Sequence, residues 1–274
     1  MGSLNSFFNT AAICFKVSSS GLLMALLLNS SLVVSQSRFP NLQAHAHNDY
    51  EHARPLKEAL ENGFISVEAD VHLQNNTLLV YHNRPGPKAR TLEQLYLAPL
   101  DSLLKANAGT VYIGYEGPFF LMIDCKSDAT TTYHLILREL KKHPALLCSS
   151  GSCAVKIFIS GNRDIATMLK DGYLGIGIDG RPSDIGRNFS SEIMPLISDN
   201  FKNWSSWNGK ADLSTEDLKK VKDLAARVHV EGKQLRLWAI PDNEKAWEEL
   251  LLAGVDLINT DHLKELNIFL TRIK

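Results

Sequence analysis

The sequence alternates short apolar runs with amphipathic stretches from about residue 43 to residue 272. Runs such as FFLMID and LRLWAI are continuously apolar, as expected of strands buried on both faces of a parallel sheet. One amphipathic stretch begins with a Ser-x-x-Asp cap at Ser214 and ends at Gly232, which are typical helix boundaries. Because the alternation continues without a change in charge or composition, it predicts a single α/β domain.

We predict strands at 43–48, 64–71, 77–82, 118–124, 154–160, 174–179, 196–201, 235–240 and 256–260, and helices at 55–62, 91–106, 129–142, 162–170, 214–230, 243–253 and 261–272. Polar residues end many of these strands: His47, Asp70, His82, Asp124, Asp179 and Asp261. That pattern favours a closed, eight-stranded (β/α)8 TIM-type barrel, whose active site lies at the carboxyl ends of the strands. Nine candidate strands exceed eight, and QNN links two of them like a hairpin, so we expect an irregular barrel. The glycines of GYLGIGIDG lie on a strand with no helix after it, which argues against a dinucleotide site.

The N-terminus resembles a leader. Residues 21–34 form an apolar run that is short for a bilayer span of about 20 residues. Small residues stand at the −3 and −1 positions of a cleavage after Ser35. We therefore predict a signal peptide at 1–35 followed by a barrel domain at 36–274, in a secreted or secretory-pathway lumenal protein. An uncleaved anchor and a mitochondrial presequence are the alternatives, although Lys16 is the leader's one basic residue before the run.

Other features agree with an oxidising lumen. Three Asn-x-Ser/Thr sequons outside the leader predict glycosylation at Asn75, Asn188 and Asn203. Cys148 and Cys153 flank SSGS, a spacer that can close a small disulfide loop. Cys125 is then single, and its apolar strand predicts a buried thiol.

The charge balance constrains the partners. Lys plus Arg number 29 and Asp plus Glu number 30, giving a net charge of −1 without a basic stripe. This excludes a nucleic-acid footprint and favours a small or neutral partner. Trp204 and Trp207 are interpreted as ordinary loop aromatics; membrane contact through this loop is the alternative, which a glycan at Asn203 would oppose. The oligomeric state is not specified by the sequence.

Two histidines and two carboxylates stand on neighbouring predicted strands. His45 and His47 are two residues apart and so share a strand face, and either can serve as a general acid or base. Glu68 and Asp70 alternate in the same way within an apolar strand. Carboxylates directed into an apolar interior are costly unless a cation neutralises them, and hard divalent cations prefer oxygen ligands. A surface loop and a solvated strand face are the alternatives.

Two further strand ends add polar groups. His82 ends an apolar run and begins a Pro/Gly-rich loop, where it is placed for proton transfer, and Arg84 nearby could reach a phosphate. Asp124 and Lys126 share a face at the end of another buried strand. They could supply a third oxygen ligand and a positive charge for an anionic substrate, or form a simple ion pair. Together these groups suit phosphodiester cleavage, with charge stabilisation by a metal and lysine and proton transfer by histidines.

The order His–x20–22–Glu-x-Asp–x11–His, followed by Asp-x-Lys, resembles the glycerophosphodiester phosphodiesterase and phosphatidylinositol-specific phospholipase C-like superfamily. The run HAHNDY to SVEADV is most similar to its branch of altered-inheritance-of-mitochondria proteins. LRLWAI resembles the family's late strand and implies that Trp238 lies near the pocket. VDLINTD resembles the closing strand.

The resemblance implies a metal-dependent phosphoric diester hydrolase acting on a glycerophosphodiester or a phospholipid-type head group. It implies three ligands for one Mg²⁺ or Ca²⁺ (Glu68, Asp70 and Asp124), an acid/base pair (His82 with His45 or His47) and a phosphate contact (Lys126). His-Ala-His replaces the His-Arg of many relatives, so a phosphate-binding arginine is missing there. A non-catalytic barrel that binds a phosphorylated ligand and a lyase-type phospholipase are the alternatives.

Overall fold

A computed structural model describes residues 40–147, 153–172 and 175–274. Its strands are β1 (Asn41–Ala46), β2 (Phe64–Gln74), β3 (Thr77–Val80), β4 (Arg90–Thr91), β5 (Phe119–Cys125), β6 (Val155–Gly161), β7 (Ile176–Gly180), β8 (Leu196–Asn200), β9 (Gln234–Trp238) and β10 (Leu257–Thr260). Eight of them pair in parallel in the order β1-β2-β5-β6-β7-β8-β9-β10, and β10 pairs with β1 to close the barrel. The predicted eight-stranded TIM-type barrel is confirmed.

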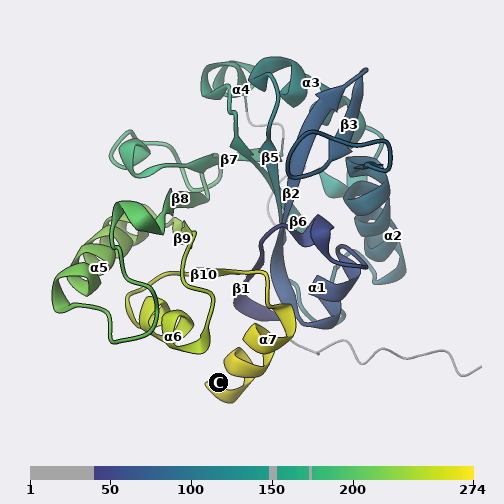
Figure 1. Cartoon of the computed structure of the whole chain (residues 1–274). Helices are drawn as coiled ribbons and strands as arrows, with labels where there is room; N and C mark the ends of the chain where they lie inside the picture. The colour runs from purple at the N-terminus through teal and green to yellow at the C-terminus, as the bar shows by residue number, and fades with distance from the viewer. Residues whose placement is uncertain (1–39, 148–152, 173–174) are drawn as a thin grey trace, which may run out of the picture. The chain divides into compact units, whose positions relative to one another are not determined.

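The α-helices lie around the outside of the strands (Figure 1). They are α1 (Lys57–Glu61), α2 (Ala98–Ala106), α3 (Ala129–Leu140), α4 (Ile165–Asp171), α5 (Thr215–Val230), α6 (Glu244–Leu252) and α7 (Leu263–Arg272). Helix α5 begins as predicted, because the Ser214 hydroxyl accepts the backbone N–H of Asp217 at 3.1 Å. Its buried residues Val221, Leu224 and Val228 recur at helical spacing and turn one face toward the barrel.

The barrel is irregular in two places. Strand β2 runs on past the barrel and pairs antiparallel with β3, which in turn pairs with β4, so β3 lies outside the barrel. The sequence left open which strand of this pair would extend beyond the barrel. Asn75 and Asn76 form the connecting turn with φ of 49° and 58°, a left-handed conformation that asparagine tolerates well. The connection from β7 to β8, residues 181–195, contains a single 3-10 turn, η4 (Pro182–Asp184), in place of a helix.

Short helical turns complete the connections: η1 (Asp49–Glu51), η2 (Glu93–Leu97), η3 (Pro144–Leu146) and η5 (Phe201–Asn203). The predicted helix 91–106 is divided, since η2 is a π-helical turn that continues into α2. Pro99, which has no backbone N–H to donate to the preceding turn, lies at this junction. None of the helices in the described ranges is both long and apolar enough to cross a bilayer. The predicted leader, residues 1–35, lies outside those ranges.

The barrel interior changes from apolar to polar toward the carboxyl ends of the strands. Met122, Phe158, Leu196 and Leu257 form a buried cluster separate from the larger core. Two residues further along each strand, side chains on the same face are Asp124, Ser160, Ser198 and Asn259. The apolar layer therefore fills the barrel interior further from the carboxyl ends of the strands. The polar layer, nearer to those ends, forms the floor of the candidate site.

Candidate active site

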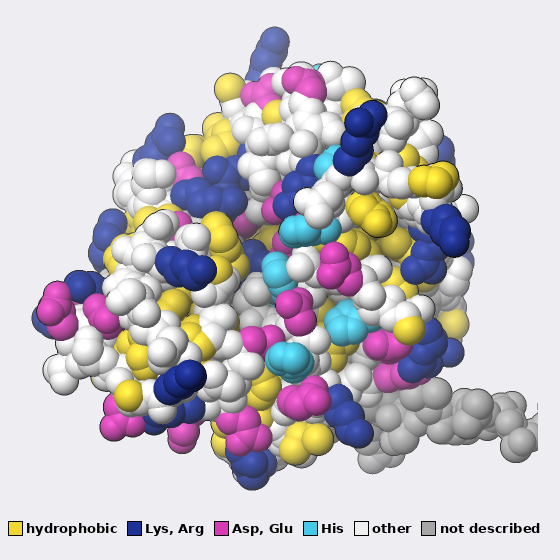
Figure 2. Space-filling view, viewed as in Figure 1, with side chains coloured by type: hydrophobic (Ala, Val, Ile, Leu, Met, Phe, Trp, Pro, Cys, Tyr) yellow, Lys and Arg dark blue, Asp and Glu magenta, His cyan; other side chains and the backbone are white. Residues whose placement is uncertain are grey.

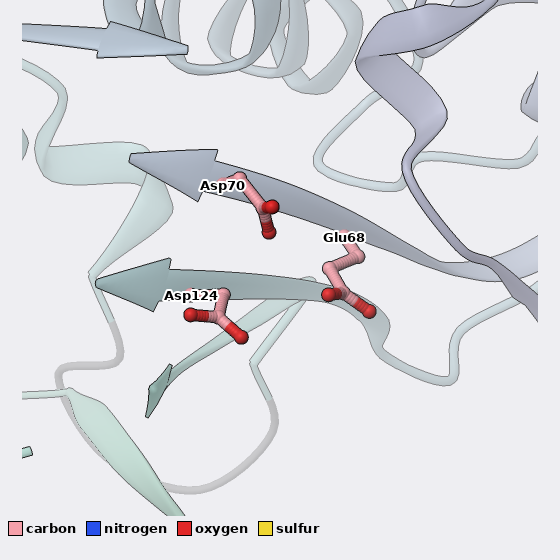
Figure 3. Close-up of side chains that lie close together, drawn as sticks. All are labelled: Glu68, Asp70 and Asp124. Atoms are coloured by element: carbon pink, nitrogen blue, oxygen red, sulfur yellow. The ribbon is translucent and has the colours of Figure 1, made fainter. Parts of the chain in front are cut away.

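Three carboxylates converge at the carboxyl ends of β2 and β5. Asp70 and Asp124 are register partners on the two paired strands, and Glu68 lies two residues before Asp70. One oxygen from each lies within 4.8 Å of the others, and their carboxylates point into a common space (Figure 3). Asp70 Oδ1 is buried and accepts no hydrogen bond from the described residues. Three carboxylates at this spacing, one of them with an unpartnered buried oxygen, fit a hard divalent cation such as Mg²⁺ or Ca²⁺.

The three carboxyl groups differ in how readily they ionise. Burial and the neighbouring Glu68 charge raise the pKa of Asp70 to about 6, and the same two causes raise the pKa of Asp124. Burial also disfavours the Glu68 carboxylate, yet the charge of Arg236 and the His45 contact hold its pKa well below the usual range. Glu68 is therefore the fixed negative charge, while the other two carboxylates gain most from added positive charge.

Arg236, which was not predicted from the sequence, provides the counter-charge for Glu68. Its guanidinium is buried; Nη2 donates to Glu68 Oε2, and Nε donates to Asn259 Oδ1 at 2.8 Å. Because His45 Nε2 also lies 3.2 Å from Glu68 Oε2, both contacts use one carboxylate oxygen. The available signal was an arginine within LRLWAI that shares a strand face with Trp238.

Lys126 lies between the other two carboxylates. Its Nζ is 3.2 Å from Asp70 Oδ2 and 3.1 Å from Asp124 Oδ1. Gly161 at the end of β6 has φ +66°, and a Cβ there would lie 2.1 Å from Asp124 Oδ1. Only glycine allows the backbone to approach the Asp124 carboxylate this closely.

The two first-strand histidines occupy different environments. His45 is fully buried, with Nδ1 2.7 Å from Ser66 Oγ and Nε2 3.2 Å from Glu68 Oε2, and burial lowers its pKa to about 4. His47 follows the end of β1 and lines the pocket, with Nδ1 2.8 Å from Asp261 Oδ1. Burial opposes the charge on His47, but the contact with Asp261 and the charge of Glu68 together outweigh it and raise the pKa.

His82 faces the pocket from beyond β3. Its Nδ1 lies 3.0 Å from Asp70 Oδ2 and 3.2 Å from the Tyr50 hydroxyl. That hydroxyl donates to Asn48 Oδ1 at 2.6 Å, which connects His82 to the loop after β1. Histidine and acidic side chains gather beside a hollow at the centre of this face (Figure 2).

The pocket has a volume of about 440 Å³. Its lining residues are His47, Asn48, Glu68, Asp70, His82, Asp124, Cys125, Lys126, Ser160, Gly161, Asn162, Arg181, Arg236 and Trp238. Seven of the residues selected from the sequence are among them; His45 lies behind the wall, and Arg84 is on an exposed loop outside the lining. Arg181 and Arg236 are the main additions, and Arg181 gave no signal because it lies in an irregular connection.

The remaining predicted sites lie apart from the pocket. The sequon residues Asn75, Asn188 and Asn203 are exposed, and their glycosylation stays a prediction. Cys148 lies outside the described residues, so its pairing with Cys153 also stays a prediction, whereas Cys125 is a buried free thiol. Both indoles of the 200–209 loop are half-buried and donate within the protein, Trp204 to Asp199 and Trp207 to the Ala211 carbonyl.

Asp49 anchors the loop that carries Asn48 and Tyr50. Its Oδ2 accepts the backbone N–H of Leu56 at 2.6 Å and the hydroxyl of Tyr96 at 2.8 Å. Burial dominates over these hydrogen bonds and raises the pKa of Asp49 to about 6. The Asp49 carboxylate therefore binds a proton more tightly in the folded protein than in the unfolded chain.

Asp49→Asn should change how stability depends on pH. The stabilisation due to Asp49 is complete below an ordinary aspartate pKa of about 3.9 and is lost as pH rises through about 6. Asparagine cannot ionise, so the stability of the variant relative to wild type should rise by about 2–3 kcal/mol between pH 4 and pH 7. Urea unfolding across this range measures the difference, and a difference that is constant with pH would contradict the assignment.

Two phosphodiesterase family models match parts of this chain. Residues 35–145 match the family described as AIM6-like phosphodiesterase domain, and residues 234–264 match the glycerophosphoryl diester phosphodiesterase family. The crystal structure of glycerophosphodiester phosphodiesterase from Agrobacterium tumefaciens str. C58 has a TM-score of 0.49 and 12% identity, covering 84% of this chain and 99% of that chain.

Two curated relatives define the family. Altered inheritance of mitochondria protein 6 from Eremothecium gossypii is 31% identical over 272 residues, which cover 83% of this chain and 69% of the relative. The protein of the same name from Lachancea thermotolerans is 27% identical over 292 residues, covering 86% of this chain and 67% of the relative. The chain belongs to the altered inheritance of mitochondria protein 6 family, and the resemblance inferred from its motifs is confirmed.

Proposed function

We propose that this protein is a metal-dependent phosphoric diester hydrolase that acts on a glycerophosphodiester or a phospholipid-type head group. The observation that carries the proposal is the convergence of Glu68, Asp70 and Asp124 within 4.8 Å in the pocket that His47 and His82 also line. The matches to two phosphodiesterase families support this reaction class. The predicted leader supports action in the secretory pathway or outside the cell.

Glu68, Asp70 and Asp124 would hold the cation through one or more carboxylate oxygens each. A divalent cation bound there would stabilise negative charge on the phosphoryl oxygens. Lys126 adds a positive charge on the same side of the pocket, where its Nζ already lies 3.1–3.2 Å from two of the carboxylates. Its amine therefore contacts a non-bridging phosphate oxygen and helps to orient the substrate.

His47 and His82 act as the acid/base pair. Each ring has its Nδ1 next to a carboxylate, that of Asp261 for His47 and that of Asp70 for His82, which leaves Nε2 for proton exchange. One imidazole removes the proton from the nucleophile, and the other protonates the leaving oxygen. His45 has both nitrogens engaged and is buried, so it positions Glu68 instead of exchanging protons with substrate.

Removal of the cation should abolish activity. Purified protein is offered glycerophosphocholine, lysophosphatidylcholine and phosphatidylinositol, and turnover is measured before and after treatment with EDTA. We expect hydrolysis of at least one diester, its loss by at least roughly 100-fold in EDTA, and recovery with Mg²⁺ or Ca²⁺. Full activity in EDTA would refute the metal requirement, and absence of turnover with metal bound would favour a ligand-binding barrel. Detection of a cyclic product would indicate attack by a substrate hydroxyl.

A further inference from the structure

Three cationic side chains line the pocket in the described part of the chain: Lys126, Arg181 and Arg236. Lys126 contacts Asp70 and Asp124, and Arg236 contacts Glu68, so both are paired with the carboxylates of the proposed metal site. Arg181 differs, because its ion-pair partner is Asp179. Asp179 is fully buried and is absent from the described pocket lining. Arg181 therefore presents positive charge to the pocket, with its counter-charge behind it.

The Arg181 guanidinium is held in place before any ligand binds. Its Nη1 donates to Asp179 Oδ2 at 2.7 Å and to the Gly180 carbonyl at 2.8 Å, and Nη2 lies 3.3 Å from Ser160 Oγ. Ser160 in turn donates to Asp179 Oδ2 at 2.7 Å. A guanidinium fixed on one edge loses little conformational entropy on binding, which favours recognition of an anion by its remaining donors.

A second guanidinium, that of Arg163, contacts the main chain of Asp179. Arg163 Nη1 donates to the main-chain carbonyl of Asp179. Burial and the neighbouring Arg181 charge lower the pKa of Arg163, whereas the Asp179 carboxylate raises that of Arg181 against the effect of burial. Asp124 and Asp199 add further negative charge around Arg181. The positive charge of Arg181 is thus retained, and its direct carboxylate partner is Asp179.

Arg181 lies on a different side of the pocket from the proposed metal site. It follows β7, whereas Asp124 ends β5, and β6 with Ser160 stands between them. Strands are about 4.8 Å apart, so the two backbones are separated by about 10 Å. An anionic substituent on the alcohol part of a bound phosphodiester can therefore be met by Arg181 from the side of the pocket that follows β7.

We propose that Arg181 is a specificity-determining residue, and that the pocket selects phosphodiesters whose alcohol part carries a second anionic group. This inference rests on the proposed function for the identity of the scissile group.

The test compares two phosphomonoesters that differ in one group. Glycerate 3-phosphate carries a carboxylate where glycerol 3-phosphate carries a hydroxymethyl group. Their binding to the full chain in the presence of Mg²⁺ is measured by titration calorimetry. We expect wild type to bind glycerate 3-phosphate more tightly, because a hydrogen bond to a charged group adds roughly 10- to 100-fold in affinity. Equal affinity for the two ligands would overturn the proposal.

The variants separate recognition from structure. Arg181→Gln alone leaves the buried Asp179 without its partner, so the main variant is Asp179→Asn/Arg181→Gln, which removes both charges. The double variant should weaken the binding of glycerate 3-phosphate roughly 10- to 100-fold and should change the affinity for glycerol 3-phosphate by no more than about twofold. Arg187→Gln is the matched control, since Arg187 lies on the same connection, is exposed and pairs with Asp184 outside the lining. Equal weakening of both ligands, or of neither, would refute a role in selection.

The outcome is independent of turnover. If no diester is hydrolysed but the preference for glycerate 3-phosphate depends on Arg181, the proposed function is wrong and the anion contact of Arg181 stands. If diesters are hydrolysed and no such preference exists, the proposed function stands and this inference is wrong.

Discussion

Glu68→Gln is expected to lower kcat by at least roughly 1,000-fold and to destabilise the fold by about 3–5 kcal/mol. Activity falls because the Glu68 carboxylate is the fixed negative charge among the three proposed metal ligands. Stability falls because Arg236 then keeps a buried positive charge without a partner. Urea unfolding measures the stability loss, and assays of diester hydrolysis at saturating Mg²⁺ measure the loss of kcat.

A double variant distinguishes the two effects of Glu68. Glu68→Gln/Arg236→Met removes both members of the buried ion pair, and replacing a buried pair by apolar groups is often neutral. The double variant should therefore recover most of the lost stability while its activity remains as low as that of Glu68→Gln. Recovery of activity along with stability would mean that Glu68 serves only as the partner of Arg236.

Much of the site was predictable because strand alternation and strand ends are local features of the sequence. The two-residue spacing of Glu68 and Asp70 in SVEADV places both carboxylates on one strand face. A neighbouring buried strand, which carries Asp124 near its end, brings a third carboxylate beside them. The closed barrel followed from the same logic, since polar residues at several strand ends have a common rim. These inferences needed no knowledge of contacts between distant segments.

The arginines were missed because their roles depend on long-range contacts. Arg236 meets Glu68 across 168 residues of sequence, and nothing around either residue specifies the pairing. Arg181 follows β7 in a connection that contains only a short 3-10 turn, so no helical or strand pattern marks its direction. Alternation also placed His45 and His47 on one face but could not show that β1 ends at Ala46, between them. Whether an imidazole is buried or accessible depends on how deep it lies in the barrel. The spacing of residues in the sequence does not show that depth.

That difference in depth yields the second prediction. His47→Gln should lower kcat by about 100- to 10,000-fold, the range for loss of a general acid or base, with little change in stability because the side chain lies at the pocket rim. His45→Gln should instead destabilise the fold by about 1–3 kcal/mol, since Ser66 and Glu68 lose a buried partner, and should retain more activity than His47→Gln. Steady-state kinetics and urea unfolding of both variants make the comparison; the reverse order of activities would assign proton transfer to His45.

The pH profile tests the role of His47 through its partner. The Asp261 carboxylate, 2.8 Å from Nδ1, raises the pKa of His47, so Asp261→Asn should lower it. If His47 is the base, the acidic limb of the kcat/KM profile moves to lower pH; if it is the acid, the alkaline limb does. In either case one limb of the profile shifts to lower pH and the other stays in place. The control is Asp256→Asn, which alters the partner of the distant His229 and should shift neither limb. An Asp261→Asn profile that coincides with that of the wild type would exclude His47 from the proton transfers that limit the reaction.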